Sequence, residues 1–111
     1  MGKLETYRQI IEQLLDEYTQ IPYAYGEVES KVVYDRQNDQ YLMLAIGWEG
    51  VKRVHGCVVH IEIIDGKVWI QQDGTEDGVA GELVEKGIQS GNIVLGFRPA
   101  QLRQYTGFAV A

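Results

Sequence analysis

Three acidic side chains form the cluster in this sequence that is best suited to metal chemistry. Asp73, Glu76 and Asp77 follow a strand-like apolar segment and lie just before a short helical pattern. Divalent cations such as Mg²⁺ and Ca²⁺ prefer several convergent carboxylate oxygens, so a metal-dependent enzyme or a ligand-binding domain could use this cluster. Carboxylates at the start of a helix also cap free amides and stabilise its positive end. Because the spacing matches no established metal-binding loop, we favour capping.

Two histidines and one cysteine are the remaining candidates for catalysis. His55 and Cys57 share a face of a predicted strand, and a neighbouring histidine can activate a thiol. We expect that face to be a buried apolar surface, so a structural role is favoured for both residues. His55 and His60 are five residues apart, which places them on opposite faces of a strand unless a bulge lies between them. The sequence therefore predicts no catalytic residue and no cofactor, and a protein that is not an enzyme.

The two histidines and the cysteine lie in a segment from Gln40 to Asp73 that reads as three successive β-strands. These strands define the predicted sheet. Gly50-Val51 and Asp65-Gly66 have the size of two-residue hairpin loops. The register set by these turns pairs Glu49 with Lys52, two opposite charges. It also places ten residues on one apolar face, which we expect the N-terminal helix to cover: Leu42, Leu44, Ile46, Trp48, Cys57, Val59, Ile61, Ile63, Val68 and Ile70.

The reverse face of this predicted sheet is mixed in polarity. It carries Tyr41, Met43, Ala45, Gly47, Gly56, Val58, His60, Glu62, Trp69 and Gln71. Such a face is too apolar to be fully solvated and too polar for a sealed core. We therefore expect cover by the C-terminal segment or by another subunit, and we favour a homo-oligomer.

The rest of the chain supplies helices and one more strand. Apolar residues recur at steps of three and four from Lys3 to Thr19, which predicts an amphipathic helix, and the tyrosine-rich connector IPYAYGE follows. Residues 28–34 form a predicted strand, and its hairpin pairs Tyr34 with either Tyr41 or Gln40. A short helix is predicted over residues 79–86, a short strand within 93–97, and a last helix from Pro99.

Together these elements predict an α+β fold in a single domain over residues 1–111. The expected architecture is a two-layer sandwich, in which an antiparallel sheet of four to five strands carries the N-terminal helix and the short C-terminal helices on one face. The length suits one domain with one core.

Charge and composition restrict the partners. Ten basic and sixteen acidic residues give a net charge of −6, and the basic residues are scattered singly, so direct nucleic-acid binding is not expected. The single cysteine excludes an intrachain disulfide, the N-terminus has no secretory pattern, and no apolar stretch approaches the roughly 20 residues that span a bilayer. The sequence favours a cytoplasmic protein without a membrane anchor.

Six residues are candidates for a protein interface. Trp48 lies opposite Arg53 in the predicted register, and Trp69 lies near Glu62 and Lys67. These residues are candidates because tryptophan and arginine often dominate interface energetics. The same tryptophans are equally compatible with ordinary packing at a sheet edge. The full candidate set is Trp48, Arg53, His60, Trp69, Tyr41 and Met43.

Several long segments resemble one protein family over nearly the whole chain. These segments are YRQIIEQLLDEY, IPYAYGE, GWEGVKRVHGCVVHIEIIDGKVWIQQDGTEDGVAGELVEKGI, IVLGFRP and YTGFAVA. They closely resemble the XisI family, the fdxN element excision controlling factors of cyanobacteria. The chain departs from the family pattern at residues 89–92, where a proline and acidic residues are common, and at Arg98, where histidine is common.

The resemblance implies a function without implying a catalytic residue. It suggests an accessory protein for programmed DNA rearrangement during heterocyst differentiation, which works with a recombinase and a companion called XisH. Because the chain is acidic, we expect it to act through protein contacts with an XisH-like companion or a recombination complex, while the partner contacts DNA.

Overall fold

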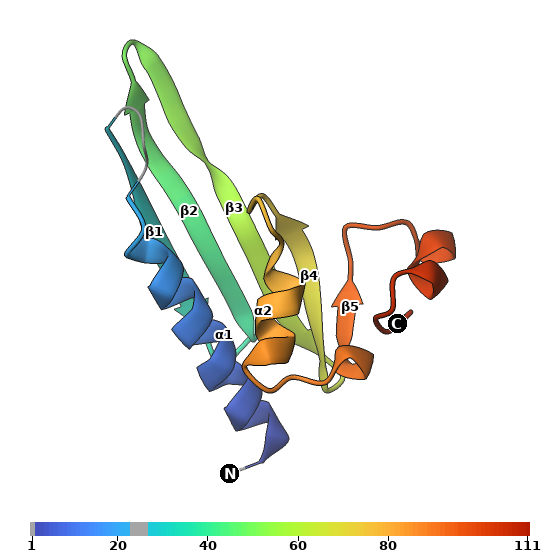
Figure 1. The fold of residues 1–111 in the computed structure, drawn as a ribbon. Coiled ribbons are helices and arrows are strands. Elements are labelled where there is room, and N and C mark those ends of the chain that lie inside the picture. Colours follow the sequence, from blue (N-terminus) through green and yellow to red (C-terminus); the bar gives the residue numbers. More distant parts are fainter. Residues whose placement is uncertain (1, 23–26) are drawn as a thin grey trace.

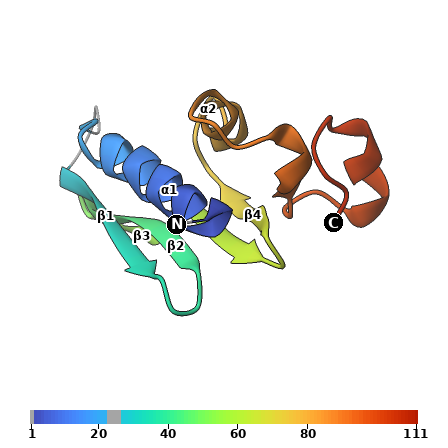
Figure 2. The same ribbon diagram turned by 90° about the horizontal axis from the view of Figure 1, so that it is seen from below.

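An α-helical layer on one face of a five-stranded sheet forms the fold. The computed structural model describes residues 2–22 and 27–111, so residues 23–26 of the predicted connector lie outside it. Helix α1 (Lys3–Thr19) and helix α2 (Val79–Glu85) lie side by side on the same face of the sheet (Figure 1). In the perpendicular view, neither α1 nor α2 lies on the opposite face (Figure 2). The predicted α+β fold class is confirmed.

Helix α1 has the bounds that its apolar periodicity predicts. The side chains buried against the sheet and α2 follow the helical repeat, whereas glutamate and glutamine fill the outer face. Near the C-terminal end, the Thr19 hydroxyl donates to the Asp16 carbonyl at 2.6 Å, and Pro22 follows shortly after. The buried residues of the helix are Tyr7, Ile10, Ile11, Leu14 and Leu15.

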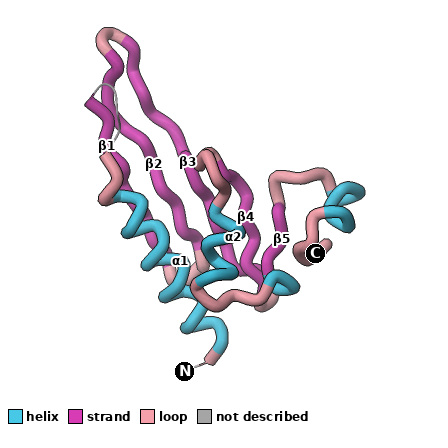
Figure 3. Tube along the Cα trace, viewed as in Figure 1, coloured by secondary structure: helices cyan, strands magenta, loops and turns pink. Residues whose placement is uncertain are grey.

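The sheet is mixed, with strand order β1-β2-β3-β4-β5. Strands β1 (Glu27–Asp35), β2 (Gln40–Glu49), β3 (Lys52–Ile64) and β4 (Lys67–Asp73) form an antiparallel meander, and the short β5 (Ile93–Leu95) lies beyond β4 (Figure 3). Strand β5 pairs with β4 in parallel, which differs from the expected all-antiparallel sheet. The connection through α2 explains the difference, because a crossover returns the chain to the beginning of β4.

The three hairpins follow the turn chemistry of the sequence. Tyr34 pairs with Tyr41 across the first hairpin, which decides between the two registers that the sequence left open. Gly50 has a φ of 62° in the second turn, and Asp65 and Gly66 have φ values of 51° and 80° in the third. Consecutive positive φ angles characterise the type I′ turn, whose twist matches that of the flanking strands.

A β-bulge at Val58 divides the predicted apolar face between the two sides of the sheet. Leu44 pairs with Cys57 as expected, but Met43 pairs with Val59, so Val58 is an extra residue in β3. An unpaired residue reverses the side to which every following residue points. The expectation that all ten apolar residues share one face is therefore wrong.

The core consists of one half of the predicted apolar face and part of the predicted reverse face. Val59, Ile61, Ile63, Val68 and Ile70 are buried beneath the helices, as expected. The β2 residues that join them are Tyr41, Met43 and Ala45, which were expected on the reverse face. Leu42, Leu44, Ile46, Trp48 and Cys57 lie on the uncovered side instead.

The C-terminal segment protects the β5 edge of the sheet. Two 3₁₀ helices, η1 (Ser90–Asn92) and η2 (Ala100–Tyr105), flank β5, and η2 takes the place of the helix predicted after Pro99. The tail then returns, and the Ala109 amide donates to the Ile93 carbonyl at 2.8 Å. None of the described helices is long and apolar enough to cross a membrane.

Candidate functional site

The uncovered side of the sheet, which we call the open face, carries a row of apolar residues. Paired residues on adjacent strands point to the same side, so the strand register defines this surface. Trp48 is 48% exposed and Val33 is 49% exposed. The apolar members of the open face are Val33, Leu42, Leu44, Ile46, Trp48, Cys57 and Ile64. A sheet normally buries such a row against a second layer, so the open face is suited to contact with another protein.

Trp48 and Arg53 form the most prominent pair on the open face. They lie opposite each other on β2 and β3, and the Arg53 guanidinium carbon is 5.0 Å from the centroid of the Trp48 ring. This cation–π contact joins the two side chains across β2 and β3. A large exposed aromatic ring next to an arginine is the residue combination that most often dominates binding energy in protein interfaces.

A chain of hydrogen bonds forms a polar strip at the other end of the open face. The His60 imidazole Nε2 contacts the Gln40 Oε1 at 2.7 Å, and the Gln40 amide donates to the Glu62 carboxylate. Gln71 donates to the second Glu62 oxygen at 2.8 Å. These bonds link three strands and fix the side chains. The open face therefore combines an apolar region with an ordered polar border.

The C-terminal segment partly covers Trp69, unlike Trp48. The Arg103 guanidinium lies 5.1 Å from the Trp69 ring centroid. The backbone at Gly96 passes so close that an added Cβ atom would lie 3.1 Å from the Trp69 ring. The geometry at Trp69 fits packing at a sheet edge. Trp48 is the tryptophan that stays accessible.

Two of the candidate interface residues are buried in the core. Tyr41 is 0% exposed and Met43 is 4% exposed, because the bulge in β3 places their partners Ile61 and Val59 on the helix-covered face that they share. They are not available to a partner. The candidate residues on the open face are Trp48, Arg53, His60 and Trp69.

The Asp73 carboxylate caps the loop that leads into α2. One oxygen accepts hydrogen bonds from the Thr75 amide at 3.0 Å and the Thr75 hydroxyl at 2.6 Å. The other oxygen accepts from the Val79 amide at 2.8 Å, at the start of α2. Glu76 and Asp77 are exposed. Among the described residues, no three histidine, cysteine, aspartate or glutamate side chains gather in a metal-binding arrangement. The contacts of Asp73 favour capping.

Replacement of Asp73 by alanine should destabilise the fold by about 1 to 2 kcal/mol, the usual cost of losing a helix cap. The three donors that Asp73 satisfies would lose their acceptor. Glu76→Ala is the matched control, because Glu76 belongs to the same acidic cluster and is exposed. Chemical unfolding of both variants measures the difference. Equal stability of the two would contradict the capping role.

The histidines and the cysteine do not form a catalytic group. The bulge at Val58 places His55 and His60 on the same side of the sheet, but they pair with Ile46 and Leu42, which are four residues apart. His55 is exposed, in contrast to the expected burial. The Cys57 thiol donates to the Val59 carbonyl, and burial raises the pKa of this thiol, which disfavours the reactive thiolate.

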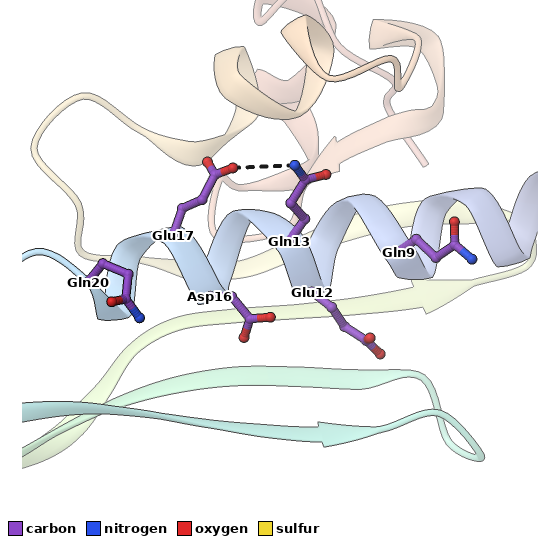
Figure 4. Close-up of a pocket in the computed structure, with 6 residues that line it drawn as sticks. All are labelled: Gln9, Glu12, Gln13, Asp16, Glu17 and Gln20. Atoms are coloured by element: carbon purple, nitrogen blue, oxygen red, sulfur yellow. Dashed lines mark hydrogen bonds between the residues drawn. The ribbon is translucent and has the colours of Figure 1, made fainter.

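A hollow of about 430 Å³ on the outer surface of α1 has polar side chains that do not converge. Figure 4 shows Glu12 and Asp16 pointing toward the strands, whereas Gln13 and Glu17 point to the other side of the helix. Both groups already have partners: Glu12 binds Arg36 at 2.8 Å, and Glu17 binds Lys86 at 3.0 Å. These contacts attach α1 to its neighbours and leave no free pair for acid–base catalysis in this hollow.

A second hollow, of about 340 Å³, lies between the C-terminal end of α1 and the loop after β4. Two of its polar side chains, Tyr18 and Thr75, are bonded within the chain. The Tyr18 hydroxyl donates to Glu82, and burial raises the pKa of Tyr18, so this hydroxyl stays protonated. The Thr75 hydroxyl donates to Asp73. The open face is therefore the surface with the clearest capacity for function.

Comparisons with known proteins identify relatives over the full length of the chain. The sequence profile of the XisI protein family matches residues 1–110. None of the curated proteins matches the chain. A solved XisI-like protein from Anabaena variabilis ATCC 29413 is 36% identical, with 97% of this chain and 99% of that chain covered and a TM-score of 0.89.

A second solved structure supports the same assignment. The fdxN element excision controlling factor XisI from Anabaena variabilis ATCC 29413 is 35% identical, with 99% of this chain and 100% of that chain covered and a TM-score of 0.83. The sequence match and the structural matches each cover nearly the whole chain. The chain is a member of the XisI protein family.

Proposed function

We propose that this protein is an accessory factor that controls DNA excision through contacts with other proteins, not through catalysis. The observation that carries the proposal is the open face, an apolar side of the sheet on which neither α1 nor α2 lies. Membership of the XisI family supports a role in excision control. The partner that we propose is an XisH-like companion or a recombination complex, in the cytoplasm during heterocyst differentiation.

The charge distribution supports an indirect action on DNA. The net charge is −6, and acidic residues of α1 line the surface hollow of that helix. A protein that binds the DNA backbone needs a contiguous group of lysine and arginine residues. On the open face, Arg53 lies against Trp48, and Lys31 lies next to Glu29 at 3.9 Å. The partner would therefore supply the DNA contacts.

The composition of the open face suggests how a partner would bind. Leu42, Leu44 and Ile46 form a half-buried apolar centre, and the more exposed Trp48 ring lies at its end. Charged residues surround this centre, with Glu27 and Glu29 on β1 and Arg53 on β3. An apolar centre with a polar rim is the usual anatomy of a specific interface. Trp48 is the expected centre of binding energy.

The test of this proposal is binding of the purified XisH-like companion to a Trp48→Asp variant. We expect binding to weaken at least about tenfold, because the variant loses the large apolar surface of Trp48 and places a charge next to the apolar centre, where it would be desolvated. Val84→Asp is the matched control, since Val84 is 40% exposed on α2, in the helical layer on the other side of the sheet. Circular dichroism verifies that both variants are folded.

Two outcomes would contradict the proposal. One is equal companion binding by the wild-type chain and the Trp48→Asp variant. The other is specific binding of duplex DNA by the isolated chain at physiological salt, which would show that this protein contacts DNA itself.

A further inference from the structure

Strand β1 offers a long pairing edge that no described strand occupies. It lies at one end of the sheet order and pairs with β2 in a continuous register from Glu27 to Asp35, without a bulge. The strand contains no proline. Such an edge presents unpaired amide and carbonyl groups and is a template for another strand. The opposite edge differs, because β5 is short and is paired with the tail at Ala109.

The charges on β1 would oppose most forms of pairing. Glu27, Glu29 and Lys31 point to the open face, and charged side chains on an edge strand commonly prevent association. Val28, Ser30 and Val32 point to the other side, where α1 lies. Any strand that pairs here must therefore match the charges on one face and the apolar residues on the other.

We propose that β1 of a second copy of this chain pairs antiparallel with β1 about a two-fold axis at Ser30. In this register Glu29 lies opposite Lys31 of the copy, and Lys31 lies opposite its Glu29. On the other face, Val28 lies opposite Val32 of the copy. Both charged pairs across the axis therefore join a glutamate to a lysine, and the valines on the other face pair with each other.

The neighbouring registers lack this complementarity. An axis at Glu29 places the two Glu29 side chains against each other, and an axis at Lys31 does the same for the two lysines. Like charges directly opposite in an antiparallel pair are destabilising. If the axis instead falls between two neighbouring residues, the register shifts by one residue and the side chains of paired residues point to opposite faces of the sheet. Among the registers centred on residues 29 to 31, charge complementarity therefore favours the axis at Ser30, with a second copy as the occupant of the edge.

The helical layer leaves room for this pairing. The Tyr34 hydroxyl contacts the Glu12 carbonyl and the Asp16 carboxylate, and Arg36 binds Glu5, so α1 is attached to the Tyr34 end of β1. The axis at Ser30 is four residues from Tyr34, about 13 Å along the strand. Helix α1 ends at Thr19, and β1 begins well beyond that end (Figure 1). The two copies of α1 would thus extend in opposite directions from the axis.

Pairing at β1 would also join the open faces of the two copies. Trp48 lies next to Glu27 in the sheet, and Glu27 lies opposite Val33 of the copy in the proposed register. The apolar row of one chain would continue into that of the other. This inference concerns self-association and stands independently of the partner proposed above, so its failure would leave that proposal intact.

Charge reversal tests the register. Glu29→Lys and Lys31→Glu each place like charges across both sides of the axis, and each should raise the dimer dissociation constant at least about tenfold. The double variant restores opposite charges and should return the constant to within about threefold of the wild-type value. Sedimentation equilibrium measures these constants, with Glu49→Lys at the exposed tip of the β2–β3 hairpin as the matched control.

Disulfide trapping tests the same register with an independent readout. In a Cys57→Ser background, Ser30→Cys should form an intermolecular disulfide under mild oxidation, because residues opposite each other have Cα atoms about 4.5 to 5.5 Å apart, within disulfide reach. Val32→Cys is the matched control on the same side of β1. It should not crosslink, because each Val32 lies opposite Val28 of the copy. Denaturing electrophoresis without reductant separates the two results.

Three results would overturn the inference. The first is a wild-type chain that remains a 12.5 kDa monomer at all accessible concentrations. The second is a dimer that Trp48→Asp dissociates but single charge reversals do not, which would place self-association on the open face. The third is crosslinking of Val32→Cys in place of Ser30→Cys, which would show a different register.

Discussion

Replacement of Gly47 by alanine is expected to lower the free energy of unfolding by about 3 kcal/mol or more, at the upper end of overpacking effects. A Cβ atom at this position would lie 1.9 Å from the Glu27 carbonyl oxygen and 2.6 Å from the Val28 Cα atom. Both are backbone atoms of the paired strand β1, so a side-chain rotation cannot relieve the clash. Strand β1 would have to move away from β2. Urea unfolding with a two-state fit measures the change.

Gly56→Ala is the matched control for this prediction. Gly56 lies in β3, and an added Cβ atom would have no neighbour within 4 Å. Alanine there should change stability little or raise it slightly, since it restricts the unfolded chain more than glycine does. If Gly47→Ala were as stable as Gly56→Ala, the close approach of β1 to Gly47 would be wrong. The Gly47 variant should also lose any self-association through β1.

Local patterns in the sequence account for much of the fold. The apolar repeat of α1 and the glycines of the two-residue turns act within a few residues, so they predict the helix and the hairpins correctly. The parallel pairing of β5 depends on where α2 directs the chain, which is a tertiary effect. The Tyr34–Tyr41 pair likewise required the structure, because both loop lengths satisfied the turn signals.

The bulge at Val58 was the main obstacle to predicting the candidate site. Strict alternation from the Gly50 turn placed Leu42 and Val59 on one face, and the structure places them on opposite faces. A signal for the bulge exists in the sequence. Cys57, Val58 and Val59 are three consecutive apolar residues, which interrupt the alternation of an otherwise half-buried strand. The pattern does not say which of them is the extra residue.

The long-range contacts of Asp39 are a second feature that no local pattern predicts. Its carboxylate accepts two hydrogen bonds from the Arg8 guanidinium, at 2.7 and 3.1 Å, and a third from the Tyr41 hydroxyl at 3.0 Å. It thereby joins α1, the first hairpin and the core. Tyr41 is fully buried, and burial raises its pKa, so its hydroxyl remains a donor that needs an acceptor.

Replacement of Asp39 by alanine should therefore destabilise the fold by about 2 to 3 kcal/mol, because it leaves the buried Tyr41 hydroxyl unpaired. Part of the cost comes from the backbone, since Asp39 has a φ of 52°. Asp65→Ala is the matched control for the cost of placing alanine at a positive φ angle. Asp65 has a φ of 51° in the third hairpin turn and is exposed. Equal losses in the two variants would contradict a role for the Asp39 carboxylate.

The contribution of Asp39 should depend on pH in a defined direction. The Arg8 guanidinium, opposed in part by burial, lowers the pKa of Asp39 below its usual value of 3.8. The folded state therefore binds a proton less readily than the unfolded state, so the carboxylate stabilises the fold above pH 3.8. This stabilisation should decline as the pH falls through the lowered pKa of the folded state. Urea unfolding of the wild-type and Asp39→Asn proteins at pH 7 and below pH 3.8 tests the relation. Their difference in stability should shrink at the lower pH, and a constant difference would show that the Asp39 charge does not contribute.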